Sequence, residues 1–153
     1  MLNVDQKAPD FKLADETGNN LSLNDFSGKN IVLYFYPKDN TPGCTTESIG
    51  FSALKDQFEN LNTIIIGASK DSVKSHQNFI TKQNLSVKLL ADTEGSLCED
   101  YTVWTLKKLY GREYMGIERA TFLIGTDGLI KNIWRKVKVK GHVEEVLDAV
   151  KAL

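Results

Sequence analysis

The chain has 153 residues, of which 41% are hydrophobic and 25% are charged, and its 19 basic and 20 acidic residues give a formal net charge of −1. This composition is typical of one globular domain over residues 1–153 and excludes a disordered or membrane-embedded chain. The balanced charge gives no reason to expect nucleic-acid or membrane-surface binding, and the apolar runs are far too short to span a membrane.

The first half of the chain alternates predicted strands and helices. "FKLADETGNNLSL" (11–23) predicts a hairpin that turns at Gly-Asn-Asn. "NIVLYFYP" (30–37) and "NTIIIGAS" (62–69) are continuous apolar runs, as in strands buried on both faces. Apolar residues three and four apart predict a helix from Thr45 to about Leu61. A second helix, "DSVKSHQNFITKQN" (71–84), is predicted to begin at its Asp or first Ser.

The second half predicts a short strand at 87–90, a short helix in "GSLCEDYTV" (95–103) and two strands in "ATFLIGTDGLIKNIWRKVKV" (120–139) that turn at Asp-Gly. A last amphipathic helix starts near His142. Lys136, Lys138 and Lys140 alternate with valines, as on a half-exposed strand with a solvated face. This order predicts an α/β, thioredoxin-like fold: a central mixed β-sheet flanked by helices, with an N-terminal β-hairpin.

One of the two cysteines lies where the first of these helices should begin, in "YFYPKDNTPGCTTE" (34–47). A cysteine acts as a nucleophile only as the thiolate, and a free thiol with a pKa of about 8.5 is only about 3% ionised at pH 7. The unpaired N–H groups and the positive dipole end of a helix N-terminus favour an anion at Cys44. A small helix-start residue without chemistry remains an equal alternative on position alone.

Pro37, Thr41 and Cys44 form the pattern P-x-x-x-T-x-x-C, which resembles the peroxidatic motif of the peroxiredoxins. The flanking residues are most similar to the bacterioferritin-comigratory, or Q-type, subfamily. The resemblance covers nearly the whole chain, including "APDFKLADETGN" (8–19), "MGIERATFLIGTDGLI" (115–130) and "WRKVKVKGHVEEVL" (134–147).

The resemblance implies a thiol-dependent peroxidase that reduces hydrogen peroxide and organic hydroperoxides. Cys44 would be the peroxidatic thiolate that becomes a sulfenic acid. Thr41 would hold the peroxide, Pro37 would shield the pocket from water, Arg119 would face the sulfur, and Glu47 would orient that arginine.

Ionisation of the thiol alone would explain little of the rate at which a thiol peroxidase reduces peroxide. Lowering a thiol pKa from about 8.5 to about 5.5 raises the ionised fraction only about thirtyfold, or roughly 2 kcal/mol of barrier. Much faster peroxide reduction therefore requires donors aimed at the departing oxygen. Arg119, Thr41 and the backbone N–H of Cys44 are the candidates.

Several alternatives stay open at this stage. A thiol–disulfide oxidoreductase would need C-x-x-C, which Thr45, Thr46 and Glu47 do not provide. A redox sensor would use the same cysteine without turnover. The cysteines and the two histidines lack metal-ligand spacing, so no metal is expected and the histidines are interpreted as structural; no cofactor is expected either.

Recycling is where the sequence departs from the family. Many members carry a second cysteine five residues after the first, and here that position is Ile49. Cys98 is the only possible internal resolving thiol, and we expect it to be a small buried hydrophobe. The sequence therefore favours reduction by an external thioredoxin-like or small thiol. We also expect a cytoplasmic protein, because no signal segment is visible, and a monomer or weak dimer.

Overall fold

The structure, a computed structural model, describes residues 1–153 and is built around a five-stranded mixed sheet in the order β5-β4-β3-β8-β9. These strands span Asn30–Phe35 (β3), Thr63–Ser69 (β4), Lys88–Ala91 (β5), Ala120–Ile124 (β8) and Ile130–Trp134 (β9). Strands β3, β4 and β5 are mutually parallel, whereas β8 runs antiparallel to both β3 and β9. The predicted central mixed sheet is confirmed.

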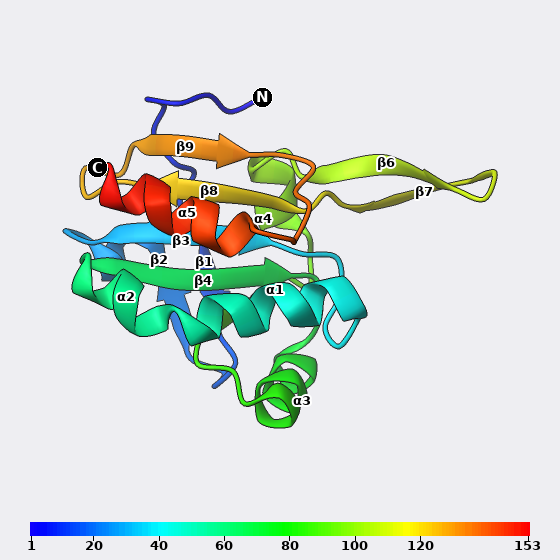
Figure 1. The fold of residues 1–153 in the computed structure, drawn as a ribbon. Helices are drawn as coiled ribbons and strands as arrows, with labels where there is room; N and C mark the ends of the chain where they lie inside the picture. Colours follow the sequence, from blue (N-terminus) through cyan, green and yellow to red (C-terminus); the bar gives the residue numbers. More distant parts are fainter.

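Two short antiparallel sheets accompany it. One is the predicted N-terminal hairpin, β1 (Lys12–Ala14) with β2 (Asn20–Ser22), followed by a 3₁₀ turn at Leu23–Phe26. The other is a hairpin of β6 (Trp104–Leu109) and β7 (Arg112–Ile117), which projects away from the body of the molecule (Figure 1). This second hairpin was not predicted from the sequence.

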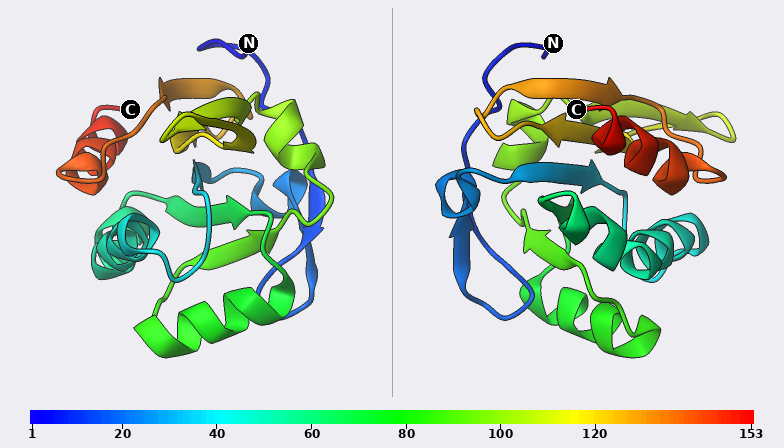
Figure 2. Two further views of the ribbon diagram at one scale, coloured as in Figure 1. Left: turned by 90° about the vertical axis from the view of Figure 1, so that its right-hand side faces the viewer. Right: turned by 60° about the vertical axis from the view of Figure 1, so that its left-hand side comes forward.

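Helices cover both faces of the central sheet. They are α1 (Pro42–Ala53), α2 (Lys55–Asn60), α3 (Val73–Gln83), α4 (Ser96–Asp100) and α5 (His142–Lys151). Helices α1, α2 and α5 lie on one side of the sheet, whereas α4 and the β1–β2 hairpin lie on the other (Figure 2). The predicted thioredoxin-like arrangement of a mixed sheet between helices is confirmed.

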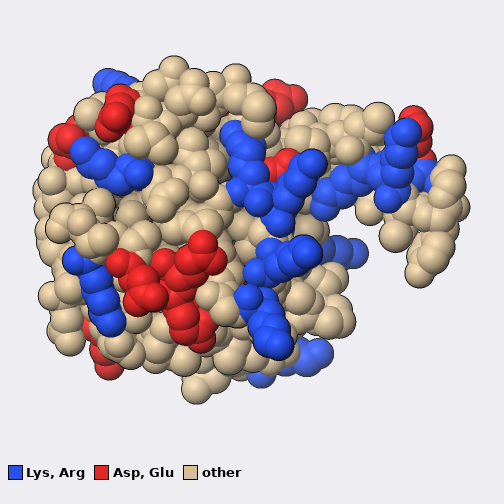
Figure 3. Space-filling view, turned by 45° about the horizontal axis from the view of Figure 1, so that its top comes forward, with Lys and Arg blue, Asp and Glu red and all other residues tan.

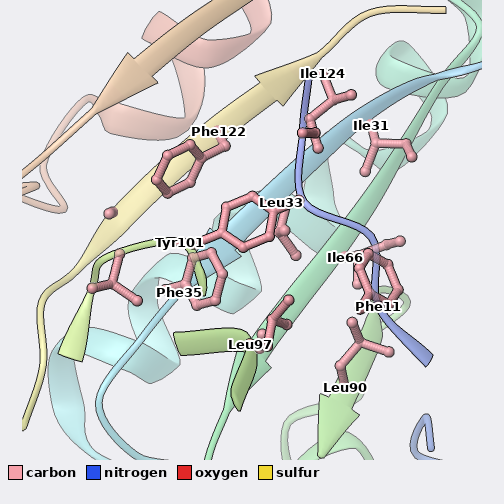
Figure 4. Close-up of a cluster of buried hydrophobic side chains, with 14 of the residues drawn as sticks. Phe11, Ile31, Leu33, Phe35, Ile66, Leu90, Leu97, Tyr101, Phe122 and Ile124 are labelled. Atoms are coloured by element: carbon pink, nitrogen blue, oxygen red, sulfur yellow. The ribbon is translucent and has the colours of Figure 1, made fainter. Parts of the chain in front are cut away.

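The alternation of side chains along β3 divides the core into two clusters. Leu33 and Phe35 point to the face that carries α4, where Tyr101 and Phe122 join them (Figure 4). Tyr34 points to the opposite face, together with Cys44 and side chains of α1, α2 and α5. A strand buried on both faces explains the unbroken apolar run from residue 31 to residue 36. The two clusters place the two cysteines on opposite sides of the sheet.

Two predictions about helix and strand extent are wrong. The helix expected from Thr45 to Leu61 starts at Pro42 and breaks at Leu54, whose φ and ψ of −101° and 7° leave the helical region. The break separates α1 from α2, which packs against β4 and α5. Residues 135–140 form no strand, because β9 ends at Trp134 and the N–H of Val137 bonds to the carbonyl of Arg119. Lys136, Lys138 and Lys140 are nevertheless exposed, as expected.

The projecting β6–β7 hairpin is both apolar and basic. Its exposed large hydrophobic residues are Leu106, Leu109, Tyr110, Tyr114 and Met115. Lysine and arginine side chains follow the hairpin and gather where it joins the body, whereas a group of acidic residues lies apart from them (Figure 3). No helix in the structure combines the length and apolar character needed to span a membrane.

Candidate active site

Cys44 lies in the first turn of α1 and is almost completely buried, with 1% of its surface exposed. The helix begins at Pro42, which has no N–H, so Gly43 and Cys44 carry the unpaired donors of this turn. The first backbone bond of the helix runs from the N–H of Thr45 to the carbonyl of Thr41. The sulfur therefore lies at the positive end of a twelve-residue helix, where a negative charge is stabilised.

Arg119 reaches Cys44 because β3 and β8 are neighbours in the sheet. Their register pairs Phe35 with Ala120, which brings the residue before β8 beside the loop that follows β3. The guanidinium donates from Nη2 to Sγ of Cys44 at 3.4 Å and from Nη1 to Oε1 of Glu47 at 2.7 Å. The two donors of the planar fork thus contact two side chains of the same helix, and this geometry fixes the direction of the guanidinium.

Glu47 is fully buried one turn after Cys44, and its Oε2 has no hydrogen-bond partner. Burial raises the pKa of this carboxyl from 4.5 to about 7, although the charge and hydrogen bond of Arg119 act in the opposite direction. A carboxylate in this position holds the guanidinium beside the sulfur. The structure brings together Cys44, Glu47 and Arg119, which the sequence analysis had named as site residues.

The raised pKa of Glu47 predicts a pH-dependent cost to stability. Because the folded protein binds this proton more tightly than the unfolded chain, stability should fall as the pH rises from 4.5 through about 7. Glu47→Gln has no such titration, so the wild type should lose stability relative to this variant between about pH 5 and about pH 8. Urea unfolding of both proteins at the two pH values measures the difference. A gap between the two midpoints that stays constant with pH would contradict the prediction.

Gly43 permits the close approach of the arginine. A Cβ atom at this position would lie 3.2 Å from Nη2 of Arg119 and 4.0 Å from a methyl group of Val139. Lys107, on the unpredicted β6–β7 hairpin, adds a further positive charge nearby. Burial, followed by repulsion from Arg119, lowers the pKa of its ammonium below the usual range. The rim of the site is therefore basic on the side of the hairpin.

The other predicted members of the motif lie in the loop between β3 and α1. Thr41 is half-buried at the N-cap of α1, and its hydroxyl donates to the carbonyl of Lys38 at 2.8 Å instead of capping the helix. Pro37 is exposed at the start of the loop, directly after the last buried residue of the β3 segment. The structure therefore places both residues in the loop that leads to Cys44, with Pro37 at its outer edge.

Cys98 lies in α4 and is fully buried among the residues of the other core cluster. Burial and the neighbouring Asp92 carboxylate raise the pKa of its thiol well above the usual range. The sheet separates this sulfur from Cys44. Ile49, at the position of the resolving cysteine in many family members, lies on α1 with 43% of its surface exposed.

A second buried polar group, which was not predicted from the sequence, lies beside the loop. Ligand-type atoms of Asp39, Asp71 and His76 lie within 4.8 Å of one another, a spacing that could suit a metal ion. However, the imidazole bonds directly to Asp39 at 2.7 Å through Nδ1 and to the carbonyl of Leu90 at 2.8 Å through Nε2. Both ring nitrogens are thus engaged within the protein. Only the helix-forming pattern around residue 76 was visible in the sequence, and it gives no sign of these contacts.

Known proteins share much of this sequence and its fold. Residues 4–133 match the model of the AhpC/TSA family. The chain is 51% identical over 150 residues to "Peroxiredoxin Bcp" of Bacillus subtilis (strain 168), covering 98% of this chain and 96% of that protein. It is 36% identical to "Peroxiredoxin Bcp" of Escherichia coli (strain K12), with the same coverage of both chains.

Two solved structures agree closely with this fold. A mutant of PrxQ from Xylella fastidiosa superposes with a TM-score of 0.94 at 42% identity, covering 99% of this chain and 97% of that one. The bacterioferritin comigratory protein of Xanthomonas campestris superposes with a TM-score of 0.89 at 44% identity, covering 93% and 90% of the two chains. The chain therefore belongs to the AhpC/TSA family, and within it to the peroxiredoxins of the Bcp or Q type, which makes it a thiol-dependent peroxidase.

Proposed function

We propose that residues 1–153 act as one thioredoxin-like domain in which Cys44 is the residue that attacks the peroxide. The observation that carries this proposal is the fork of Arg119, which donates to Sγ of Cys44 and to Glu47 at the N-terminus of α1. This arrangement places positive charge and backbone donors around one buried sulfur. Such preorganised donors stabilise the charge that develops as an O–O bond breaks.

In the first step, the thiolate of Cys44 attacks the terminal oxygen of the peroxide. An S–O bond forms as the O–O bond breaks, so sulfur is oxidised to a sulfenic acid and the peroxide is reduced. The leaving oxygen departs as hydroxide or alkoxide and takes up the proton that the thiol released on ionisation. Arg119 and the N–H of Cys44 stabilise the charge on the two oxygens, and the hydroxyl of Thr41 holds the peroxide.

Hydrogen peroxide and organic hydroperoxides are the proposed substrates. The related Xanthomonas campestris protein is described as having alkyl peroxide reduction activity, and the site around Cys44 is assembled here from the same kind of fold. Peroxide consumption in the presence of a thiol reductant, measured with both substrate classes, tests the assignment. A redox sensor would react once and stop, whereas a peroxidase consumes many equivalents of peroxide.

We further propose a single-cysteine cycle. An external thiol, from a thioredoxin-type protein or a small molecule, attacks the sulfenic acid, releases water and forms a mixed disulfide; a second thiol then frees Cys44. The burial of Cys98 on the other side of the sheet supports this route. A disulfide needs Cα atoms within about 7 Å, a distance that does not suit residues in separate cores.

Cys98→Ser should therefore keep the steady-state peroxidase activity of the wild type. Mass spectrometry after one equivalent of peroxide should show the added oxygen of a sulfenic acid, and non-reducing peptide mapping should show no bond between Cys44 and Cys98. Loss of turnover in Cys98→Ser, together with such a bond in the oxidised wild type, would instead make Cys98 the resolving residue.

We also make a proposal about the cellular compartment of the protein and one about its oligomeric state. A chain with two free cysteines suits a reducing compartment such as the cytoplasm. We also propose a monomer or a weak dimer, since Cys44, Glu47 and Arg119 contact one another within a single chain. Sedimentation velocity at several protein concentrations tests the second point, and a tight oligomer at low concentration would contradict it.

A further inference from the structure

A buried ion pair lies behind the loop that carries Thr41. The side chains of His76 and Asp39 are 0% and 2% exposed, and Nδ1 of the imidazole is 2.7 Å from Oδ2 of the carboxylate. Asp39 also accepts a hydrogen bond from the hydroxyl of Tyr36 at 2.6 Å and one from Ser75 at 2.8 Å. Three donors therefore converge on one carboxylate beneath the loop.

The contacts of His76 determine its protonation. Nε2 lies 2.8 Å from the carbonyl of Leu90, which can only accept, so this nitrogen carries a proton. Nδ1 faces the Asp39 carboxylate and carries a proton as well. Burial lowers the pKa of the imidazole, but the hydrogen bond and charge of Asp39 outweigh it and the net shift is upward. The side chain thus ties Asp39 to β5 through both ring nitrogens.

A single peptide unit connects this pair to Thr41. The N–H of Asp39 donates to Oδ2 of Asp71 at 2.8 Å, while the carbonyl of Lys38, in the same peptide, accepts from the hydroxyl of Thr41 at 2.8 Å. Asn40, which lies between Asp39 and Thr41 in the sequence, adopts a left-handed conformation with φ of 61°. This conformation folds the chain back over the peptide between Lys38 and Asp39. Because a peptide unit is planar, fixing its N–H side also fixes the direction of its carbonyl.

The direction of that carbonyl decides what Thr41 can offer a substrate. A hydroxyl has one proton to donate and two lone pairs that accept. Here the proton is directed to Lys38, so the lone pairs remain to accept a hydrogen bond from the O–H of a peroxide. If the peptide between Lys38 and Asp39 turned, the Thr41 hydroxyl would lose this acceptor. Its proton and lone pairs would then have no fixed direction.

We propose that Asp39 and His76, together with Asp71, are positioning residues that orient the Thr41 hydroxyl as an acceptor for the peroxide, through the peptide between Lys38 and Asp39. This inference rests on the proposed role of Thr41 in binding peroxide. It goes beyond that role because it assigns the orientation to His76 on α3, to Asp71 in the loop before α3 and to Asp39, which occupies an unspecified position of the P-x-x-x-T-x-x-C motif.

Two substitutions at position 76 separate positioning from general stability. In the His76→Asn variant, the side-chain amide nitrogen lies near the position that Nδ1 occupies in the wild type, so it can still donate to Asp39. In the His76→Gln variant, the amide nitrogen lies near the position of Nε2 and can reach only the carbonyl of Leu90. Each variant loses one buried hydrogen bond, so both should be destabilised to a similar extent. We expect the rate constant for oxidation of the thiol by hydrogen peroxide to fall roughly tenfold in His76→Gln, because small misplacements of binding groups have effects of this size. The Asn variant should stay within about threefold of wild type.

The rate constant is measured by single-turnover stopped flow, and urea unfolding monitors stability. Val150→Ala, which truncates a buried side chain in α5, serves as a control that lowers stability without touching the loop. If His76→Gln does not fold, Asp39→Asn takes its place, since it keeps the backbone bond to Asp71 but removes the negative charge. Equal rate constants in His76→Gln and His76→Asn would overturn the proposal, and so would a roughly tenfold fall of the rate constant in Val150→Ala.

A double-mutant cycle with Thr41→Val completes the test. If the network acts through the hydroxyl, His76→Gln should cause little further loss in the Thr41→Val background. Fully additive losses would show that the network acts by another route and would overturn the positioning role alone. A Thr41→Val variant as fast as wild type would overturn the role of Thr41 itself, and the absence of a sulfenic acid in the wild type would overturn the proposed function.

Discussion

Cys44→Ser should consume no peroxide while keeping the wild-type fold. A serine hydroxyl is not appreciably ionised near neutral pH, so the variant lacks the nucleophile that must attack the terminal oxygen. The change replaces a buried sulfur with a smaller oxygen that can still accept from Arg119, and a site of this kind should tolerate it. We therefore expect activity at the level of the uncatalysed reaction between peroxide and the reductant.

Peroxide consumption in the presence of dithiothreitol measures the effect, and circular dichroism with urea unfolding reports on the fold. Cys98→Ser is the matched control, because it removes the only other thiol from an equally buried position on the opposite face of the sheet. Sustained turnover in Cys44→Ser would refute the assignment of the nucleophile. Loss of activity in both variants would point to a role for both thiols.

Arg119→Lys should slow the oxidation of Cys44 by roughly a hundredfold, a typical loss when one preorganised donor is removed from a site of developing charge. Lysine keeps the positive charge but lacks the planar fork that reaches Cys44 and Glu47 at once. Its single ammonium cannot occupy the positions of both guanidinium nitrogens, one beside Cys44 and the other beside Glu47. The stabilisation of the departing oxygen should therefore be lost even though the net charge of the site is unchanged.

The same substitution disturbs Glu47, whose carboxylate is fully buried and depends on the guanidinium. Lysine keeps the charge but loses the guanidinium hydrogen bond to this buried carboxylate, so Arg119→Lys should also lower the stability of the protein. Adding Glu47→Gln removes the buried charge and should recover part of the stability. It should not restore the rate, because the donor to the sulfur is still missing. Recovery of the rate in the double variant would mean that Arg119 acts mainly by supporting Glu47.

Several features could be predicted from the sequence because they depend on neighbouring residues. The apolar runs predict the buried strands β3 and β4, and residues three and four apart predict the helical stretches, because both signals follow from the periodicity of the backbone. The placement of Cys44 in the first turn of a helix likewise follows from the Thr-Pro-Gly-Cys stretch. The resemblance to the peroxiredoxins adds the partners of this cysteine, which local patterns alone do not identify.

Other local signals proved misleading or too weak. The alternation of lysine and valine in residues 136–140 has the period of a strand, but no strand pairs with this segment. The β6–β7 hairpin lacks a clear apolar face, because it projects from the body and buries little of its surface. Periodicity indicates which face of an element is buried, so it carries little information where an element is exposed on both faces.

The sequence by itself determined the strand–helix order apart from the β6–β7 hairpin, the placement of Cys44 in the first turn of a helix and the presence of a threonine and a proline before it. Only the tertiary structure decided which distant residues meet: Arg119 reaches a sulfur 75 positions earlier because β8 pairs with β3, and His76 lies under the loop because α3 packs beside β5. It also separated Cys98 from Cys44 by a whole sheet. The physical reason is that local conformation follows from short-range sterics and hydrogen bonds, whereas these contacts depend on the order of strands in the sheet, which cooperative packing of the whole chain selects.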